Sequence, residues 1–194
     1  MEMALFCGLE RAPTFLVPII NPPFADNSPH PPPLSGMRMA ENQKLSARYQ
    51  RIYAQLKDLF RDKGTCISRM STMAALLHHK MPHFFWTGFY ILDKGELVAG
   101  PYQGPLACQV LEKNKGVCWA GIMRRQTVVV PDVQNFPGHI ACDSRSRSEI
   151  VVPLFDQNNK PWAVLDVDSK KLDAFSETDK LWLEKIAGLI RPPG

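Results

Sequence analysis

Residues 149–168, EIVVPLFDQNNKPWAVLDVD, decide the fold class of this chain. Two runs rich in aliphatic residues, 149–155 and 161–168, flank the polar segment DQNNK, and this pattern indicates two strands joined by a turn. A short turn connects antiparallel neighbours, because parallel strands need a crossover of a dozen or more residues. We therefore expect this pair to belong to an antiparallel sheet.

Further strand patterns lie upstream of this pair. HFFWTGFYIL (83–92) and ELVAG (96–100) flank a turn at residues 93–95, which predicts another hairpin. GPYQGPLACQV (100–110) is a loop punctuated by Gly and Pro that leads into a strand, and TVVVPDV (127–133) predicts one more. The chain therefore holds five or six short strands, mostly with the spacing of hairpins.

Helical patterns precede, interrupt and follow the strands. Apolar residues recur at steps of three and four from residue 45 to 59, a second stripe covers 65–80, and a short helix is indicated at 117–125. Ser176, with Asp179 three residues later, begins a last helix. This order predicts an α+β fold in which helices lie on one side of the sheet. The sequence contains neither a GxGxxG nor a P-loop pattern, which argues against dinucleotide and ATP enzymes.

Composition sets the domain organisation and narrows the partners. Eight of the 17 prolines lie in residues 1–40, so we predict a Pro-rich disordered leader there and a single folded domain over residues 41–191. The net charge of +4 comes without a basic stripe, which argues against nucleic acid. No apolar run approaches the roughly 20 residues that span a bilayer. Five cysteines, an odd number, argue against a disulfide framework and predict a cytoplasmic protein.

Three cysteines, Cys108, Cys118 and Cys142, lie in the loop-rich middle of the chain. One interpretation is redox chemistry, in which an activated thiolate is oxidised to a sulfenic acid and a second thiol condenses with it to a disulfide. Cys142 is the best nucleophile candidate, because His139, Arg145 and Arg147 are close in sequence and would stabilise its thiolate. Two alternatives stay open: a zinc site that uses Cys118, His139 and Cys142, and three ordinary core residues.

Three acidic residues are expected to face the same way as one another. Asp166 and Asp168 are two positions apart on a predicted strand, so both side chains project from one face, and Glu149 begins the preceding strand. Such a cluster suits a cation, a Mg²⁺ or Ca²⁺ ion, or a protonated substrate. If the three acids crowd together, one holds its proton at neutral pH and serves as a general acid. The alternative is a solvated strand face.

The same parity places Trp86 and Tyr90 together on one face of the aromatic strand. Aromatic faces accept cations and the electron-poor methyl and methylene groups beside a polarised sulfur. Gly88 between the two rings leaves space above the strand, which favours a pocket. Plain core packing is the alternative for most of this run.

Taken together, five segments resemble one family. FWTGFY, GPYQGPLAC, KGVC, VPDVQNFPGHIACDSRSRSEIVVP and AVLDVDS, in this order and with this spacing of the cysteines, are similar to the free methionine-(R)-sulfoxide reductases. The resemblance covers roughly residues 42–189. It implies a GAF-like domain with a central antiparallel sheet of about six strands and with the N- and C-terminal helices on one side.

The resemblance also implies a role for each candidate residue. Cys142 corresponds to the cysteine that attacks the sulfoxide sulfur, Cys108 to the main resolving cysteine and Cys118 to the second. The reaction needs no metal or cofactor, thioredoxin is the expected electron donor, the protein repairs oxidative damage, and a homodimer is expected. The implied substrate-binding residues are Trp86, Tyr90, Glu149, Asp166 and Asp168.

The sequence departs from the family pattern at three places. Trp119 follows Cys118 where the family more often has a small residue, which puts the resolving role of Cys118 in doubt. Phe85 stands where the family often has Asn, and the Pro-rich leader is not part of the pattern. The competing hypothesis is a non-catalytic GAF module that binds or senses a small ligand.

Overall fold

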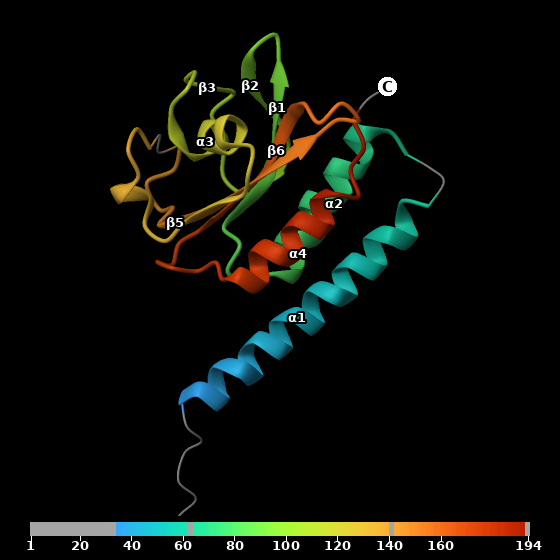
Figure 1. Ribbon diagram of the computed structural model, residues 1–194, viewed down its shortest axis with the longest axis vertical. Coiled ribbons are helices and arrows are strands. Elements are labelled where there is room, and N and C mark those ends of the chain that lie inside the picture. Colours follow the sequence, from blue (N-terminus) through green and yellow to red (C-terminus); the bar gives the residue numbers. More distant parts are fainter. Residues whose placement is uncertain (1–33, 62–63, 140–141, 193–194) are drawn as a thin grey trace, which may run out of the picture. The chain divides into compact units, whose positions relative to one another are not determined.

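The computed structural model describes residues 34–61, 64–139 and 142–192 (Figure 1). Eleven elements of secondary structure follow one another in the described part of the chain. They are α1 (Leu34–Leu59), α2 (Cys66–Lys80), β1 (Trp86–Asp93), β2 (Glu96–Gln103), β3 (Val110–Leu111), α3 (Gly116–Arg124), β4 (Val128–Val130), a 3₁₀ helix (Val133–Asn135), β5 (Ser148–Phe155), β6 (Pro161–Ser169) and α4 (Glu177–Ala187).

Six antiparallel strands form one sheet in the order β3-β2-β1-β6-β5-β4, which confirms the predicted fold class. The hairpin expected at residues 149–168 is formed by β5 and β6, with Glu149 opposite Asp168. Pro153 lies within β5 although proline donates no ladder hydrogen bond. It is tolerated because β4 pairs only with residues 149–151, so Pro153 lies beyond the strand on that side.

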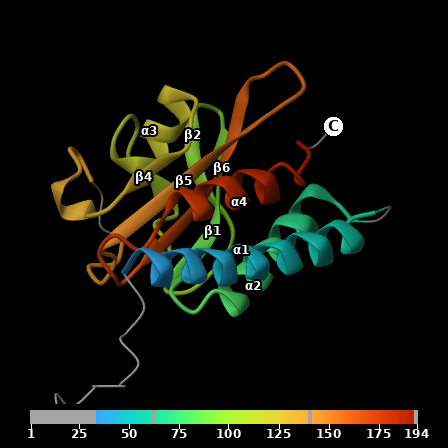
Figure 2. The same ribbon diagram turned by 60° about the horizontal axis from the view of Figure 1, so that its bottom comes forward.

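Helices cover both faces of the sheet (Figures 1 and 2). The first, second and last helices pack on one face, where alternate residues of β6 such as Leu165 and Val167 join their core. The expectation for the N- and C-terminal helices is thus confirmed. The short helix α3 covers the opposite face, where Val164 joins a second core. The broader expectation that all helices lie on one side is therefore wrong, because apolar residues of α3 are buried against this second face. Strand residues alternate in direction, so each strand supplies both cores. None of the described helices is long and apolar enough to cross a membrane.

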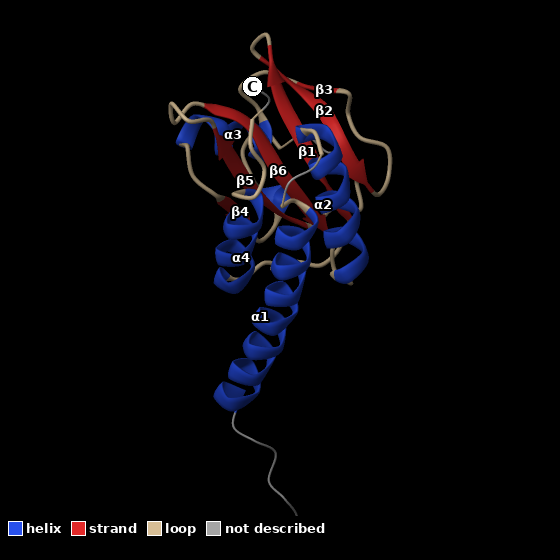
Figure 3. Ribbon diagram, turned by 90° about the vertical axis from the view of Figure 1, so that its right-hand side faces the viewer, coloured by secondary structure: helices blue, strands red, loops and turns tan. Residues whose placement is uncertain are grey.

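The helical part of the chain begins earlier than the predicted residue 41. Helix α1 already starts at Leu34, so residues 34–40 belong to it rather than to a leader without regular structure. The stretch LSGMRMA contains no proline and is rich in good helix formers, which explains the earlier start. Figure 3 shows α1 extending beyond the other helices. The rest of the predicted leader, residues 1–33, lies outside the described residues.

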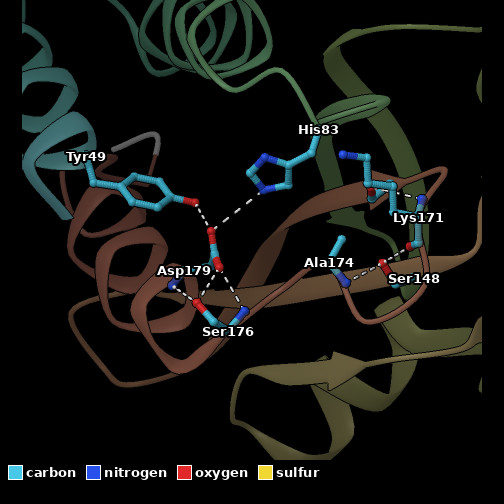
Figure 4. A network of polar contacts seen from close by, with 8 residues as sticks. Tyr49, His83, Ser148, Lys171, Ala174, Ser176 and Asp179 are labelled. Carbon is cyan, nitrogen blue, oxygen red and sulfur yellow. Dashed lines mark hydrogen bonds and ion pairs between the residues drawn. The ribbon is translucent and has the colours of Figure 1, made fainter. Parts of the chain in front are cut away.

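A buried carboxylate, Asp179, ties the helical layer together (Figure 4). The Tyr49 hydroxyl of α1 donates to one of its oxygens at 2.7 Å, and His83 Nε2 lies 3.8 Å from the same oxygen. The backbone N–H and the hydroxyl of Ser176 donate to the other oxygen, each at 2.7 Å, which completes a capping box at the start of α4. Burial raises the pKa of Asp179, but these hydrogen bonds outweigh it and hold the pKa below the usual value.

Candidate active site

A pocket lies on the α3 face of the sheet, where β1, β5 and β6 meet α3. Loops around residues 104–109 and 142–147 form its rim. Seven of the eight residues that the sequence analysis selected line this pocket, and the eighth, Cys108, is bonded to one of them. The seven are Trp86, Tyr90, Cys118, Cys142, Glu149, Asp166 and Asp168.

The three acids come from neighbouring strands at the floor of the pocket. Glu149 of β5 is paired with Asp168 of β6, and Asp166 is two residues further along the same face. Glu149 and Asp166 are 5% and 6% exposed, which is unusual for carboxylates. Among the ion pairs of the described residues, these acids have one partner, His139, whose Nδ1 lies 4.0 Å from Glu149 Oε2. The cluster therefore carries little compensating positive charge.

Burial changes the protonation of these acids. Desolvation raises the pKa of Asp166 to about 7, although hydrogen bonds from Cys118, Glu149 and the Val167 N–H oppose the rise. Burial, followed by repulsion from Asp166 and Asp168, raises the pKa of Glu149 well above its usual value. The pKa of Asp168 is raised by burial and by Asp166. The cluster thus keeps protons near neutral pH and is equipped to donate one.

Cys108 and Cys142 are joined by a disulfide at the rim of the pocket. Their Cα atoms are 5.6 Å apart, although 34 residues separate them in the sequence. Cys142 is exposed and Cys108 is half-buried, so both sulfurs are near solvent. The rim therefore brings together two thiols that are able to cycle between the dithiol and the disulfide.

The surroundings of Cys142 differ from the expectation. Arg145 was expected to stabilise its thiolate, but the guanidinium donates to both carboxylate oxygens of Asp143, at 2.9 and 2.7 Å. Asp143 is two residues from Arg145 in a tight turn, which favours this local pair over a contact with the sulfur. The other candidate, His139, lies close to Glu149 instead. The alternative zinc site with Cys142 as a ligand is not formed, because its sulfur is in the disulfide.

Cys118 lies deep in the pocket, on the side of α3 that faces the sheet. Its side chain is buried, and its sulfur lies within 4.8 Å of a carboxylate oxygen of Glu149 and one of Asp166. Burial and the neighbouring acids raise the pKa of this thiol well above the usual value. A protonated, buried thiol is a poor nucleophile. The role of Cys118 as a second resolving cysteine stays a prediction. The structure places its thiol beside the acids at the floor of the pocket.

Aromatic rings form one wall of the pocket. The Trp86 and Tyr90 rings stack with centroids 5.7 Å apart, and Tyr102 of β2 stacks on Trp86 at 5.3 Å. A Cβ at Gly88 would lie 2.6 Å from the Trp86 ring and 2.3 Å from Tyr102 Cβ. Gly88 therefore makes room for the stacked rings rather than for a ligand directly. Sequence reasoning missed Tyr102, which the pairing of Gly88 with Tyr102 across the two strands brings to this wall.

Two further residues shape the site without having been predicted. Ser146 lines the pocket and opposes the rise in the pKa of Asp168, and no short-range pattern marks that proximity because β6 lies far away in sequence. Phe85, noted only as a departure from the family, lies between two cations, with Arg145 at 4.9 Å and Lys170 at 4.3 Å from its ring centroid. These contacts hold the turn after Cys142 against the start of β1.

Known proteins resemble this chain closely. Residues 75–191 match the family described as GAF domain. GAF domain-containing protein A of Dictyostelium discoideum is 42% identical over 78% of this chain and 99% of its own length. The free methionine-R-sulfoxide reductase of Escherichia coli is 37% identical over 64% of this chain and 74% of its own. The structure of the Neisseria meningitidis free methionine-R-sulfoxide reductase in complex with its substrate superimposes with a TM-score of 0.71, at 41% identity, over 75% of this chain and 87% of that one.

Proposed function

The chain belongs to the free methionine-R-sulfoxide reductases, oxidoreductases built on the GAF domain, and from this membership we propose that it reduces free L-methionine-(R)-S-oxide to L-methionine. The observation that carries the proposal is the Cys108–Cys142 disulfide at the rim of a pocket whose floor holds three carboxylates. The rim supplies electrons, and the floor supplies charge and protons. The two substrates of such a reaction, a sulfoxide and a dithiol, meet at this rim.

The acid floor suits an amino acid that is free. Glu149, Asp166 and Asp168 lack a Lys or Arg partner among the described ion pairs, so a substrate ammonium supplies the missing positive charge. A methionine residue within a protein has no ammonium, and it would leave the buried acids unpaired. The Trp86–Tyr90 wall packs against the methyl group beside the polarised sulfur. The acids recognise the ammonium and the aromatic wall recognises the methyl group, so the pocket selects the free sulfoxide over a peptide-bound one.

The reaction proceeds by attack of the Cys142 thiolate on the sulfoxide sulfur. A carboxylic acid of the floor protonates the sulfoxide oxygen, which is transferred to the cysteine sulfur. Methionine leaves reduced by two electrons, and Cys142 is oxidised by two electrons to a sulfenic acid. The raised pKa of Asp166, about 7, keeps a proton available for this step.

Cys108 completes the cycle. Its thiol attacks the sulfenic acid of Cys142, the sulfur–sulfur bond forms and water leaves, which yields the observed disulfide. Thioredoxin then reduces this disulfide by thiol–disulfide exchange, which restores both thiols and leaves thioredoxin oxidised. Cys118 acts as an alternative resolving thiol. No metal or further cofactor takes part, and the enzyme works as a cytoplasmic homodimer in the repair of oxidative damage.

A coupled NADPH–thioredoxin assay tests this proposal with four substrates: the R and S epimers of methionine sulfoxide, each free and within a peptide. We expect turnover of the free R epimer and little of the other three. Cys142→Ser should lose turnover, and Cys66→Ser, a thiol outside the pocket, serves as its matched control. No turnover of the free R epimer by the unaltered chain would refute the proposal and favour a non-catalytic GAF module.

A further inference from the structure

Three potential metal ligands from three elements meet beneath the pocket. The Cys118 sulfur of α3, a Glu149 oxygen of β5 and an Asp166 oxygen of β6 all lie within 4.8 Å of one another. We propose that these three groups form a binding site for Zn²⁺, and that the ion blocks the pocket when it is bound. The proposal concerns a metal that inhibits, so it adds a ligand to the metal-free reaction proposed above.

An unpartnered oxygen points to a missing ligand. Asp166 is 6% exposed, and its Oδ1 atom is buried without a hydrogen-bond partner among the described residues. A buried carboxylate oxygen without a hydrogen-bond donor destabilises the folded state, so it is rare unless something binds there. A cation in the cluster satisfies it.

The donor set selects zinc among the common divalent cations. Ca²⁺ and Mg²⁺ prefer oxygen ligands alone, whereas Zn²⁺ binds thiolate sulfur and carboxylate oxygen together. Three protein ligands and one open position are the usual arrangement of an accessible zinc site. Zinc–sulfur and zinc–oxygen bonds of about 2.3 and 2.1 Å put tetrahedral ligand atoms about 3.3–3.6 Å apart. Closing the cluster from 4.8 Å to that spacing takes side-chain shifts of about 1 Å.

The backbone holds the three ligands in place. Val151 lies two residues after Glu149 on β5, and it is directly opposite Asp166 of β6 in the sheet. A Cβ at Gly121 of α3 would lie 2.9 Å from Val151 Cγ1, so the absence of a side chain there lets the helix approach the strand closely. That close approach brings Cys118, one turn earlier in α3, to the two acids. The cluster is therefore built into the packing of α3 on the sheet.

Zinc binding exchanges the ion for protons. The thiol proton of Cys118 leaves as the ion enters, because a cysteine binds zinc as its thiolate. The bound ion occupies the acids that the proposed function assigns to the substrate ammonium. Inhibition should therefore be competitive with the free sulfoxide, a consequence that rests on the proposed function.

The disulfide form of the full chain allows a test that does not depend on turnover. Cys108 and Cys142 are blocked in that form, and replacing Cys7 and Cys66 by alanine leaves Cys118 as the only thiol of the five cysteines. Equilibrium dialysis with ZnCl₂ should then show one ion per chain, and CoCl₂ should give a thiolate-to-cobalt charge-transfer absorption. In this background, Cys118→Ala should weaken Zn²⁺ binding by roughly 100-fold or more, and Glu149→Gln should weaken it by roughly 10-fold or more.

A second measurement needs no substitution in the cluster, in case those variants fold poorly. The disulfide form in which Cys7 and Cys66 are replaced by alanine keeps the whole cluster, and ZnCl₂ should raise its unfolding temperature while MgCl₂ leaves it unchanged. Lack of this stabilisation, or zinc binding that appears only after Cys108 and Cys142 are reduced, would overturn the proposal. Because binding is measured in the disulfide form, an inactive enzyme that still binds zinc would refute the proposed function alone.

Discussion

Two buried carboxylates on opposite faces of the sheet, Asp166 and Asp179, behave in opposite ways. Asp179, 1% exposed, accepts hydrogen bonds from Tyr49 and Ser176, and its pKa is held below the usual value although burial opposes this. Asp166, 6% exposed, keeps one oxygen unpartnered, and burial raises its pKa to about 7. The two side chains share their chemistry and nearly their depth, but the loss of hydration outweighs the hydrogen bonds at Asp166, whereas the hydrogen bonds outweigh that loss at Asp179.

This difference separates a structural acid from a functional one. A carboxylate surrounded by donors is stable as an anion and holds elements together. A carboxylate surrounded by apolar groups and other acids is costly to ionise, so it is suited to release a proton or to accept a cation from outside. We therefore expect changes at Asp166 to alter turnover, and changes at Asp179 to alter the free energy of unfolding.

The largest expected effect is on turnover. Asp168→Asn or Asp166→Asn should lower kcat/KM for the free R epimer by roughly 100-fold, because a buried charge pair that loses one side costs about 3 kcal/mol. Asp93→Asn, which changes an exposed carboxylate at the end of β1, is the matched control and should leave the value unchanged. Steady-state assays measure all three, and near-normal kinetics in both pocket variants would remove the acids from the reaction.

The next effect is on stability. Asp179→Ala should lower the free energy of unfolding by about 3 kcal/mol, since it leaves the Tyr49 hydroxyl and the start of α4 without their acceptor. Urea denaturation measures this loss. The fraction that stays folded should keep nearly normal kcat/KM, and a large kinetic defect in that fraction would blur the division between the two acids.

The free energy of unfolding should depend on pH in opposite directions for the two acids, and Asp166 is the one whose contribution falls as the pH rises. Its folded pKa, about 7, exceeds the ordinary carboxyl value of 3.8, so the stability that protonation contributes is present below pH 4 and is lost as pH rises through 7. Asp166→Asn carries no charge to bury. The free energy of unfolding of this variant, relative to that of the unaltered chain, should therefore increase by about 2 kcal/mol between pH 5.5 and 8.5. The change arises over the roughly 1.5 pH units between pH 5.5 and the folded pKa, at about 1.4 kcal/mol for each unit.

Urea titrations of both proteins at the two pH values measure this shift. Asp179→Asn supplies the opposite case, because the depressed pKa of Asp179 adds stability above the ordinary carboxyl pKa and loses it as the pH falls through the folded value. The unfolding free energy that Asp179→Asn loses relative to the unaltered chain should therefore be the same at pH 5.5 and at pH 8.5. A flat difference between Asp166→Asn and the unaltered chain would show that Asp166 is not protonated in the folded state.

The smallest effect isolates one hydrogen bond of the structural acid. Tyr49→Phe removes only the hydroxyl that donates to Asp179 at 2.7 Å, and it should cost about 1 kcal/mol of unfolding free energy. The ring stays stacked near Trp182, so packing changes little. Thermal unfolding reports the change, and a loss as large as that of Asp179→Ala would mean that the hydroxyl alone accounts for the network.

Much of the site followed from strand parity. Asp166 and Asp168 line one pocket because residues two apart share a strand face, and the same rule placed Trp86 beside Tyr90. Contacts that depend on packing did not follow. Tyr102 reaches the wall through its neighbour on β1, and Arg145 turns toward Asp143 instead of the cysteine.

The sequence by itself determined the antiparallel hairpins, the helical stripes, the family and the residues that line the pocket, because hydrophobic periodicity and local turn chemistry are written in neighbouring positions. Only the tertiary structure decided which groups meet across long separations: the stacking of Tyr102 on Trp86, the place of Cys118 among the acids, and the opposite protonation of Asp166 and Asp179. Burial and the number of facing donors set a pKa, and both arise when distant segments pack together.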